Sequence, residues 1–62
     1  MRQTQDGFEV VVLNCEENWA IIHEDLADLE HEVTFEDTER IFVIFEDEDE
    51  ARHFELVAIS PL

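Results

Sequence analysis

Five consecutive apolar residues, Ile41-Phe42-Val43-Ile44-Phe45, constrain the fold of this 62-residue chain more than any other stretch. The run has the length of a β-strand, and both of its alternating faces are apolar. A chain of this size builds only one small core, so a strand with two apolar faces belongs at its centre. We therefore predict that residues 41–45 form the central strand of a small sheet.

Two further stretches have strand character. Residues 8–14 (FEVVVLN) are rich in β-branched side chains and follow the only glycine, Gly7. Val33 and Phe35 alternate with polar neighbours, which predicts a short, half-buried strand, and residues 36–39 suit a turn into the central strand. Residues 1–6 are polar, and we expect them to be flexible.

A helix is predicted over residues 15–29, because apolar side chains recur there in steps of three and four. Asn14 is a favourable N-cap residue, and Glu17 at the third following position approximates a capping box. The apolar stripe consists of Cys15, Trp19, Ile22, Leu26 and Leu29.

A second helix is predicted to begin after Asp47, which can act as its N-cap, with Glu50 at the third position. Pro61 would end this helix, because the residue before a proline avoids the helical region. The inward face of this helix consists of Ala51, Phe54, Val57 and Ala58.

The predicted order of elements is βαββα. It indicates a single acidic α+β domain over residues 1–62, in which two helices cover one face of a three-stranded sheet. This arrangement resembles a ferredoxin-like fold that stops before its fourth strand. The sequence leaves open whether the last residues add a strand or only end the second helix.

Two helices leave the other face of the sheet open. Strand alternation places Val11, Leu13, Phe42 and Ile44 on that face. A contiguous apolar patch marks an interface, so we predict a homodimer, with a different partner protein as an alternative. A further alternative is that the N-terminal residues or residues 59–62 fold over the patch.

Charge excludes several classes of partner. Eighteen Asp and Glu face three arginines and no lysine, which gives a formal net charge of −15. Binding to nucleic acid or to a lipid surface requires basic groups, so neither is expected. We expect a cytoplasmic protein, because the chain has one cysteine, no signal-peptide pattern and no apolar run that could span a membrane.

The stretch Phe42-Val43-Ile44-Phe45 resembles the end of the third strand in RNA-recognition motifs, where strand aromatics stack on bases. The front half of that motif carries a basic residue and two small ones. This chain has Thr38, Glu39, Arg40 and Ile41 there. We interpret the resemblance as shared fold geometry, because RNA would meet a strongly acidic surface.

Metal and catalytic sites are not predicted. An EF-hand loop starting at Asp47 would need glycine at its sixth position and glutamate at its twelfth, where this chain has Arg52 and Ala58. A weak cation site in the acidic run remains an alternative. Four side chains could in principle bind zinc but lack the familiar spacing: Cys15, His23, His31 and His53. No catalytic motif accompanies the acids, so we expect no cofactor and no enzymatic activity.

The acids themselves are the candidate site. Glu17, Glu24 and Asp28 would fall on the helix face opposite the apolar stripe. Glu24 and Asp28 would be about one turn (roughly 5–6 Å) apart, which is of the same order as phosphate spacing, and Glu17 would lie about two turns before Glu24. The other candidates are Asp25, Asp47, Glu48, Asp49 and Glu50. We predict an interaction protein whose acids bind a basic, nucleic-acid-binding surface of a partner.

In size and charge the chain resembles the small acidic DNA-mimic inhibitors of bacteriophages, which act on host enzymes or CRISPR effectors. Two alternatives remain open. In the first, the acids serve only solubility; in the second, the chain is an assembly module that works through the apolar sheet face.

Overall fold

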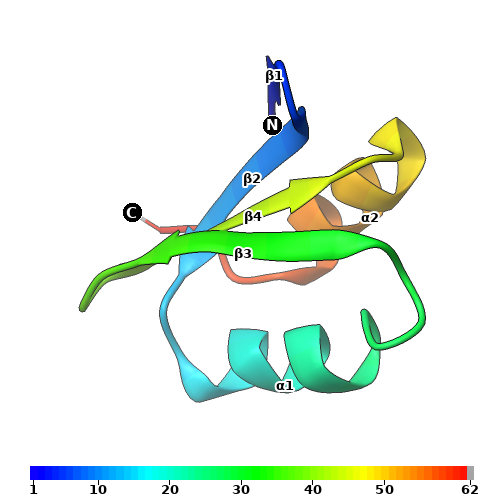
Figure 1. The fold of residues 1–62 in the computed structure, drawn as a ribbon. Coiled ribbons are helices and arrows are strands. Elements are labelled where there is room, and N and C mark those ends of the chain that lie inside the picture. Colours follow the sequence, from blue (N-terminus) through cyan, green and yellow to red (C-terminus); the bar gives the residue numbers. More distant parts are fainter. Residues whose placement is uncertain (62) are drawn as a thin grey trace.

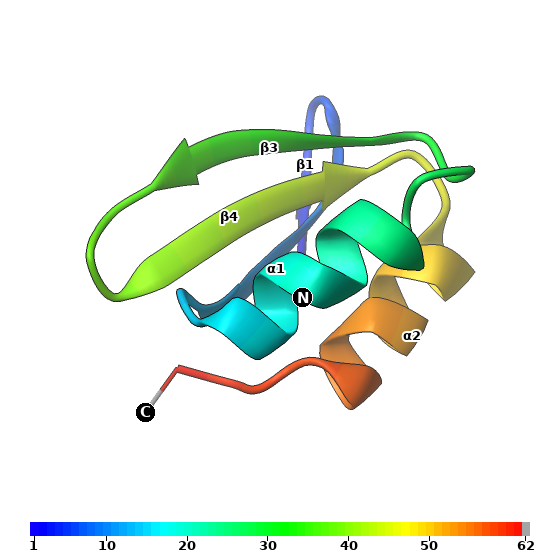
Figure 2. The ribbon, with the colours of Figure 1, turned by 90° about the horizontal axis from the view of Figure 1, so that it is seen from below.

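Two helices cover one face of a four-stranded sheet in the computed structural model, which describes residues 1–61 (Figures 1 and 2). The strands are β1 (Arg2–Thr4), β2 (Gly7–Leu13), β3 (His31–Glu36) and β4 (Arg40–Phe45), and the helices are α1 (Glu16–Glu24) and α2 (Glu48–Val57). The strand order is β1-β2-β4-β3, and every neighbouring pair is antiparallel. The predicted α+β class is confirmed.

The apolar run forms β4, which lies between β2 and β3 as predicted. Its alternate residues Ile41, Val43 and Phe45 are fully buried under the helices. Phe42 and Ile44 lie on the opposite face and are half-buried. The core is completed by Val10 and Val12 of β2, Ile22 and Leu26 from the α1 side, and Ala51, Phe54 and Ala58 from the α2 side.

The prediction of three strands is wrong by one strand. Residues Arg2–Thr4, for which no regular structure was predicted, form β1 and pair with β2, and Thr4 lies opposite Gly7. Gly7 has a φ of 144°, and a Cβ at this position would collide with the carbonyl oxygen of Phe45, so the turn requires glycine. β1 was missed because it is a short edge strand with no apolar alternation.

Helix α1 is shorter than predicted at its C-terminal end. It ends at Glu24 instead of residue 29, and Leu26 then donates its backbone N–H to the carbonyl of Ile21 at 3.2 Å. Asp25 and Asp28 follow the negative end of the helix dipole, where carboxylates are unfavourable. Leu26 is nevertheless buried, and Leu29 packs against the core. Both residues therefore face inward as predicted, although they lie in the turn and not in the helix.

The predicted capping box of α1 is wrong. Cys15 occupies the N-cap position, and no side chain caps the helix there. The Asn14 side chain instead accepts a hydrogen bond from the Trp19 indole at 2.7 Å and donates one to the carbonyl of Asp37 at 2.6 Å. Asn14 therefore connects α1 to the β3–β4 turn.

Helix α2 begins as predicted. The Asp47 carboxylate accepts hydrogen bonds from the backbone N–H groups of Asp49 at 2.7 Å and Glu50 at 3.4 Å. Ala51 and Phe54 face the core, whereas Val57 remains 48% exposed. The helix ends at Val57, several residues before Pro61, and the chain continues in an extended path.

The extended path after α2 is fixed by Asn18, which is fully buried in α1. Its amide donates to the carbonyls of Leu13 at 2.7 Å and Ile59 at 2.9 Å, and its oxygen accepts from the Ile59 N–H at 2.8 Å. In residues 58–61, the chain therefore neither continues the helix nor forms a further strand.

Strand β3 changes face along its length. Val33 lies opposite Val43 and packs against the core, but the register shifts before Phe35, which lies opposite Phe42. The rings of Phe35 and Phe42 meet edge-to-face with centroids 5.5 Å apart. Simple alternation would have placed Val33 and Phe35 on one face, whereas this bulge adds Phe35 to the open face of the sheet.

Candidate partner-binding surfaces

The predicted acidic residues belong to α1, to the turn after it and to the start of α2, and the two helices share one face of the sheet (Figure 2). Glu17 and Glu24 lie in α1, and Asp25 and Asp28 lie in the turn that follows it. Because α1 ends early, Glu17, Glu24 and Asp28 do not form one continuous helical row. The remaining four, Asp47, Glu48, Asp49 and Glu50, form the N-cap and first turn of α2.

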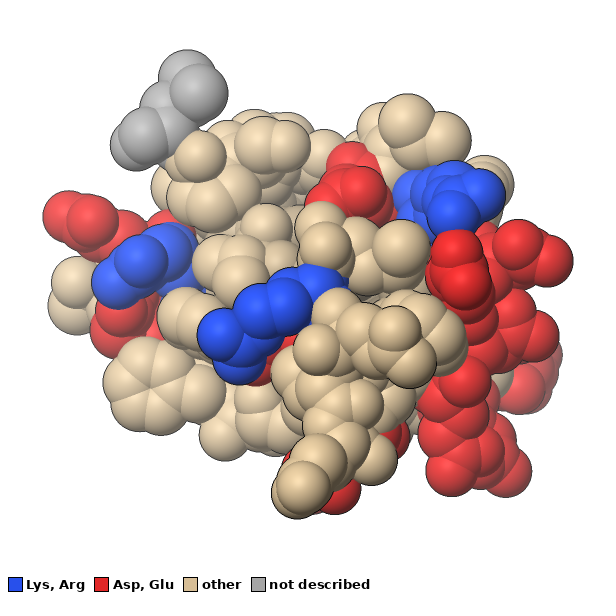
Figure 3. Space-filling model, turned by 90° about the horizontal axis from the view of Figure 1, so that it is seen from above, with Lys and Arg blue, Asp and Glu red and all other residues tan. Residues whose placement is uncertain are grey.

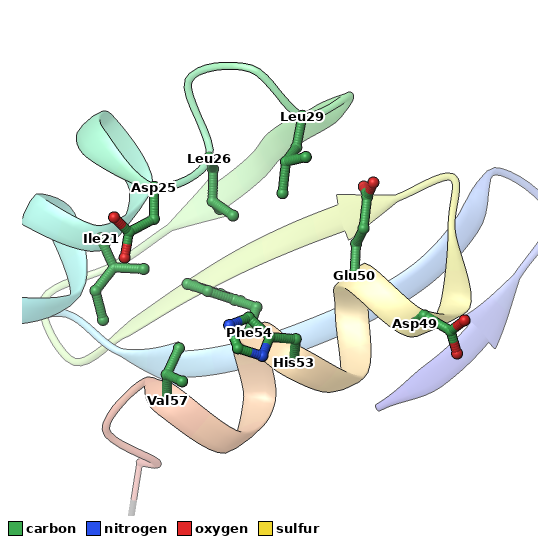
Figure 4. Close-up of a pocket in the computed structure, with 9 residues that line it drawn as sticks. All are labelled: Ile21, Asp25, Leu26, Leu29, Asp49, Glu50, His53, Phe54 and Val57. Carbon is green, nitrogen blue, oxygen red and sulfur yellow. The ribbon is translucent and has the colours of Figure 1, made fainter.

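A groove of about 380 Å³ separates the two helices (Figure 4). Its apolar lining consists of Ile21, Leu26, Leu29, Phe54 and Val57. Its polar lining consists of Asp25, Asp49, Glu50 and His53. The structure thus brings three predicted acids from two elements to one groove, and the other five predicted acids do not line it.

The groove was not predicted, although its parts were visible in the sequence. Leu26, Leu29 and Val57 were all assigned to inward faces of helices, which implied that they would be covered. Leu26 is buried, but Leu29 is half-buried and Val57 is 48% exposed at the boundary between the helices. Sequence periodicity indicates which side chains face inward, but it does not show where two short helices fail to close over them.

Each of the three arginines is already paired with a carboxylate of the same chain. Arg52 of α2 contacts Glu48 at 2.6 Å. Arg2 contacts Glu9 at 3.2 Å, and Arg40 contacts Asp37 at 3.6 Å. The excess of acids over bases is therefore not compensated locally around the groove, where His53 is the only basic side chain in the lining.

Acids also crowd at the ends of the β3–β4 hairpin. A hydrogen bond with the Glu30 carboxyl, together with its negative charge, raises the pKa of Glu46. At the turn, the backbone N–H groups of Glu39 and Arg40 donate to the Asp37 carboxylate at 2.8 and 2.7 Å and lower its pKa. The charged form of Asp37 is thus stabilised, whereas the charged form of Glu46 is disfavoured beside Glu30.

The open face of the sheet is the second candidate surface. The predicted residues Val11, Leu13, Phe42 and Ile44 are half-buried there, and Phe35 joins them with 56% of its surface exposed. The Arg40 guanidinium lies 5.7 Å from the centroid of the Phe42 ring. Figure 3 views the molecule from the side opposite to the helices, and uncharged atoms cover most of this side.

The tail covers only one part of this face. Pro61 lines a shallow hollow together with Val11, Leu13, Glu39 and Arg40. Phe35 and Phe42 do not contribute to that hollow. We call the five residues Val11, Leu13, Phe35, Phe42 and Ile44 the sheet patch.

Other features of the described chain give no separate site. Among residues 1–61, no group of three or more His, Cys, Asp and Glu side chains is placed to hold a metal ion. Within the same range, no helix is long and apolar enough to cross a membrane. Cys15 is a half-buried free thiol, and the ring of His23 stacks on Trp19 with centroids 5.6 Å apart.

Comparison with known protein families, with curated proteins and with solved structures gives no significant match to this chain. The chemistry of the groove and of the sheet patch is therefore the basis for inferring what they bind.

Proposed function

We propose that this chain is a non-enzymatic interaction protein that binds a basic surface of a partner protein and regulates or inhibits it. One observation carries the proposal: all three arginines are engaged by carboxylates of the same chain, while the net charge remains −15. Such a surface attracts cationic partners and accelerates their association.

The partner's basic surface is one that otherwise binds nucleic acid. Neighbouring carboxylates on a helix are roughly 5–6 Å apart, which is of the same order as phosphate spacing along a strand. Acids of α1, of the turn after it and of the first turn of α2 supply the negative charges, although Glu17, Glu24 and Asp28 do not form one continuous row. By occupying the partner's cationic groups, the protein would compete with the nucleic acid.

The first test is capture of partners from a cell lysate with the purified protein, washed at graded salt. We expect a captured nucleic-acid-binding protein whose affinity falls steeply between about 50 mM and 500 mM salt, because salt screens the charges. Affinity that does not change over this range would contradict the proposal.

A charge-neutralising triple variant, Glu17→Gln, Glu24→Gln and Asp28→Asn, tests where the partner binds. We expect about tenfold weaker binding, which corresponds to about 1.4 kcal/mol. The matched control is Glu32→Gln, Glu36→Gln and Glu39→Gln, three exposed acids of the β3–β4 hairpin, which changes the net charge equally. Equal weakening by both triples would contradict binding through the helical side.

A second candidate function is supported by the sheet patch. The bulge in β3 brings Phe35 against Phe42, so the open face carries a contiguous apolar surface that the tail covers only in part. Under this function the chain self-associates as an assembly module, and its acids only keep it soluble. The helical triple variant would then leave function unchanged.

A further inference from the structure

We infer that the groove between α1 and α2 binds a basic amphipathic segment of the partner: a large apolar side chain enters the groove, and neighbouring Lys or Arg side chains meet Asp25 and Glu50. This inference rests on the proposed function and adds to it the chemical class of the bound segment. It also gives the apolar lining of the groove a role, which binding by charge alone would not give it.

The base of the groove is apolar and fixed. Phe54 and Leu26 are almost fully buried there and belong to the core, so they give the base a defined shape. Val57 stands at the edge with 48% of its surface exposed. A volume of about 380 Å³ is within the range of pockets that bury an apolar ligand group, which is typically about 300–1,000 Å³.

The rim of the groove selects a positive charge. Asp25 approaches from the turn after α1, and Glu50 approaches from α2 on the other side (Figure 4). The third acid, Asp49, points away from the groove at its outer end (Figure 4). An anionic segment would be repelled by these carboxylates, whereas a neutral one would leave them unpaired.

A second copy of the chain does not fit this groove. Each copy offers only three arginines, all held by its own carboxylates, against eighteen acids. The acidic rim would therefore repel it. A basic helix whose apolar side chains recur at every third or fourth position satisfies both the lining and the rim, as in other complexes where a helix occupies a groove.

Two synthetic peptides test the inference on the unmodified protein. One is a fluorescein-labelled peptide of about 14 residues, in which leucines and one tryptophan form one face of a helix and lysines form the other. The second has the same composition in an order that forms no apolar face. We expect the amphipathic peptide to bind at least about tenfold more tightly by fluorescence anisotropy at about 150 mM salt.

Two substitutions in α2 locate the binding. Val57→Ser removes an exposed apolar wall of the groove, and we expect it to weaken binding of the amphipathic peptide about fivefold to tenfold. Leu56→Ser is the matched control, because Leu56 is 79% exposed on the same helix and does not line the groove. Circular dichroism verifies that both variants fold.

The outcomes separate this inference from the proposed function. Equal binding of the two peptides would overturn the groove assignment and leave charge-driven binding intact. Binding of neither peptide would overturn the groove assignment and contradict the proposed function as well. In a third outcome, the amphipathic peptide binds more tightly than the control peptide, but Val57→Ser and Leu56→Ser weaken its binding equally. This result would show that the apolar anchor lies elsewhere, which also overturns the assignment.

Discussion

Asn18 joins three segments of the chain through one side-chain amide: α1, the end of β2 and the residues after α2. No polar atom of this fully buried side chain lacks a partner within the described residues. Its position, three residues after Cys15 and four before Ile22, is at the edge of the predicted apolar stripe, which did not include it. A polar residue there is not recognisable as a core residue from periodicity, because its partners are backbone groups far away in the sequence.

Replacing Asn18 with leucine should therefore destabilise the fold. In Asn18→Leu, the Leu13 carbonyl and the Ile59 N–H lose the side-chain partner, and we expect the free energy of unfolding to fall by about 2–3 kcal/mol. Urea denaturation measures this change, with the exposed-site variant Leu56→Ala as control. An Asn18→Leu variant as stable as the wild type would contradict the role of the amide.

Glu46 provides a residue-scale prediction about pH. Because Glu30 raises the folded-state pKa of Glu46, the contribution of Glu46 to stability is fully present below the pKa of the unfolded chain and is lost as pH rises through the folded-state pKa. Loss of the Glu46 proton replaces the hydrogen bond with Glu30 by repulsion between the two carboxylates. We expect Glu46→Gln to raise Tm at pH 7 and to give no gain below about pH 4.

Thermal melts of Glu46→Gln and Glu32→Gln over this pH range measure the effect. Glu32 is an exposed acid of β3 for which no interaction with Glu46 is found, so it controls for the loss of one negative charge. The same gain in both variants at pH 7 would show that net charge is responsible and not the Glu30–Glu46 pair.

Among the elements, those with a strong local sequence signal could be predicted, and those without one could not. The centre of the sheet follows from the two apolar faces of β4, and the start of α2 follows from the Asp47 cap. The bulge in β3 depends on its pairing with β4, whereas the short strand β1 and the early end of α1 are not visible in the apolar periodicity. For the candidate site, the acids were predictable, but the groove between the helices required knowledge of where both helices end.

The bulge in β3 gives a prediction for self-association. It places Phe35 against Phe42 in the sheet patch, and a second copy would bury both rings. We expect Phe42→Asp to convert a homodimer into a monomer, because a carboxylate would be buried without a partner. Analytical ultracentrifugation measures the mass.

The control for Phe42→Asp is Leu56→Asp, which adds the same charge at an exposed apolar residue of α2, outside the sheet patch. If Leu56→Asp forms dimers and Phe42→Asp does not, the interface lies on the sheet patch. A wild-type monomer at all accessible concentrations would contradict self-association through this face.

At the scale of the whole molecule, net charge opposes folding. Fifteen uncompensated charges repel one another more strongly in the compact state than in the unfolded chain. We expect Tm at pH 7 to rise by several degrees between about 10 mM and 500 mM NaCl, because salt screens this repulsion. Near pH 4, close to the isoelectric point of about 4.1, the effect should disappear. A salt effect of equal size at both pH values would contradict this explanation.

Salt should therefore act in opposite directions on stability and on partner binding. A decrease in binding at high salt would otherwise be open to the objection that the protein unfolds. Because the fold is expected to become more stable under the same conditions, the two effects can be measured independently on one sample.

The strand order also has a consequence for how the chain folds. Two of the strand pairs are hairpins between segments close in the sequence: β1 with β2, and β3 with β4. Each hairpin can form early, because closing a short loop costs little entropy. The β2–β4 ladder is the only strand pairing in residues 1–61 that joins distant parts of the chain, and α1 lies between its strands in the sequence. We therefore expect the closing of this ladder to be the slow step, with the pairing of Val10 and Val43 at its centre in the folding nucleus.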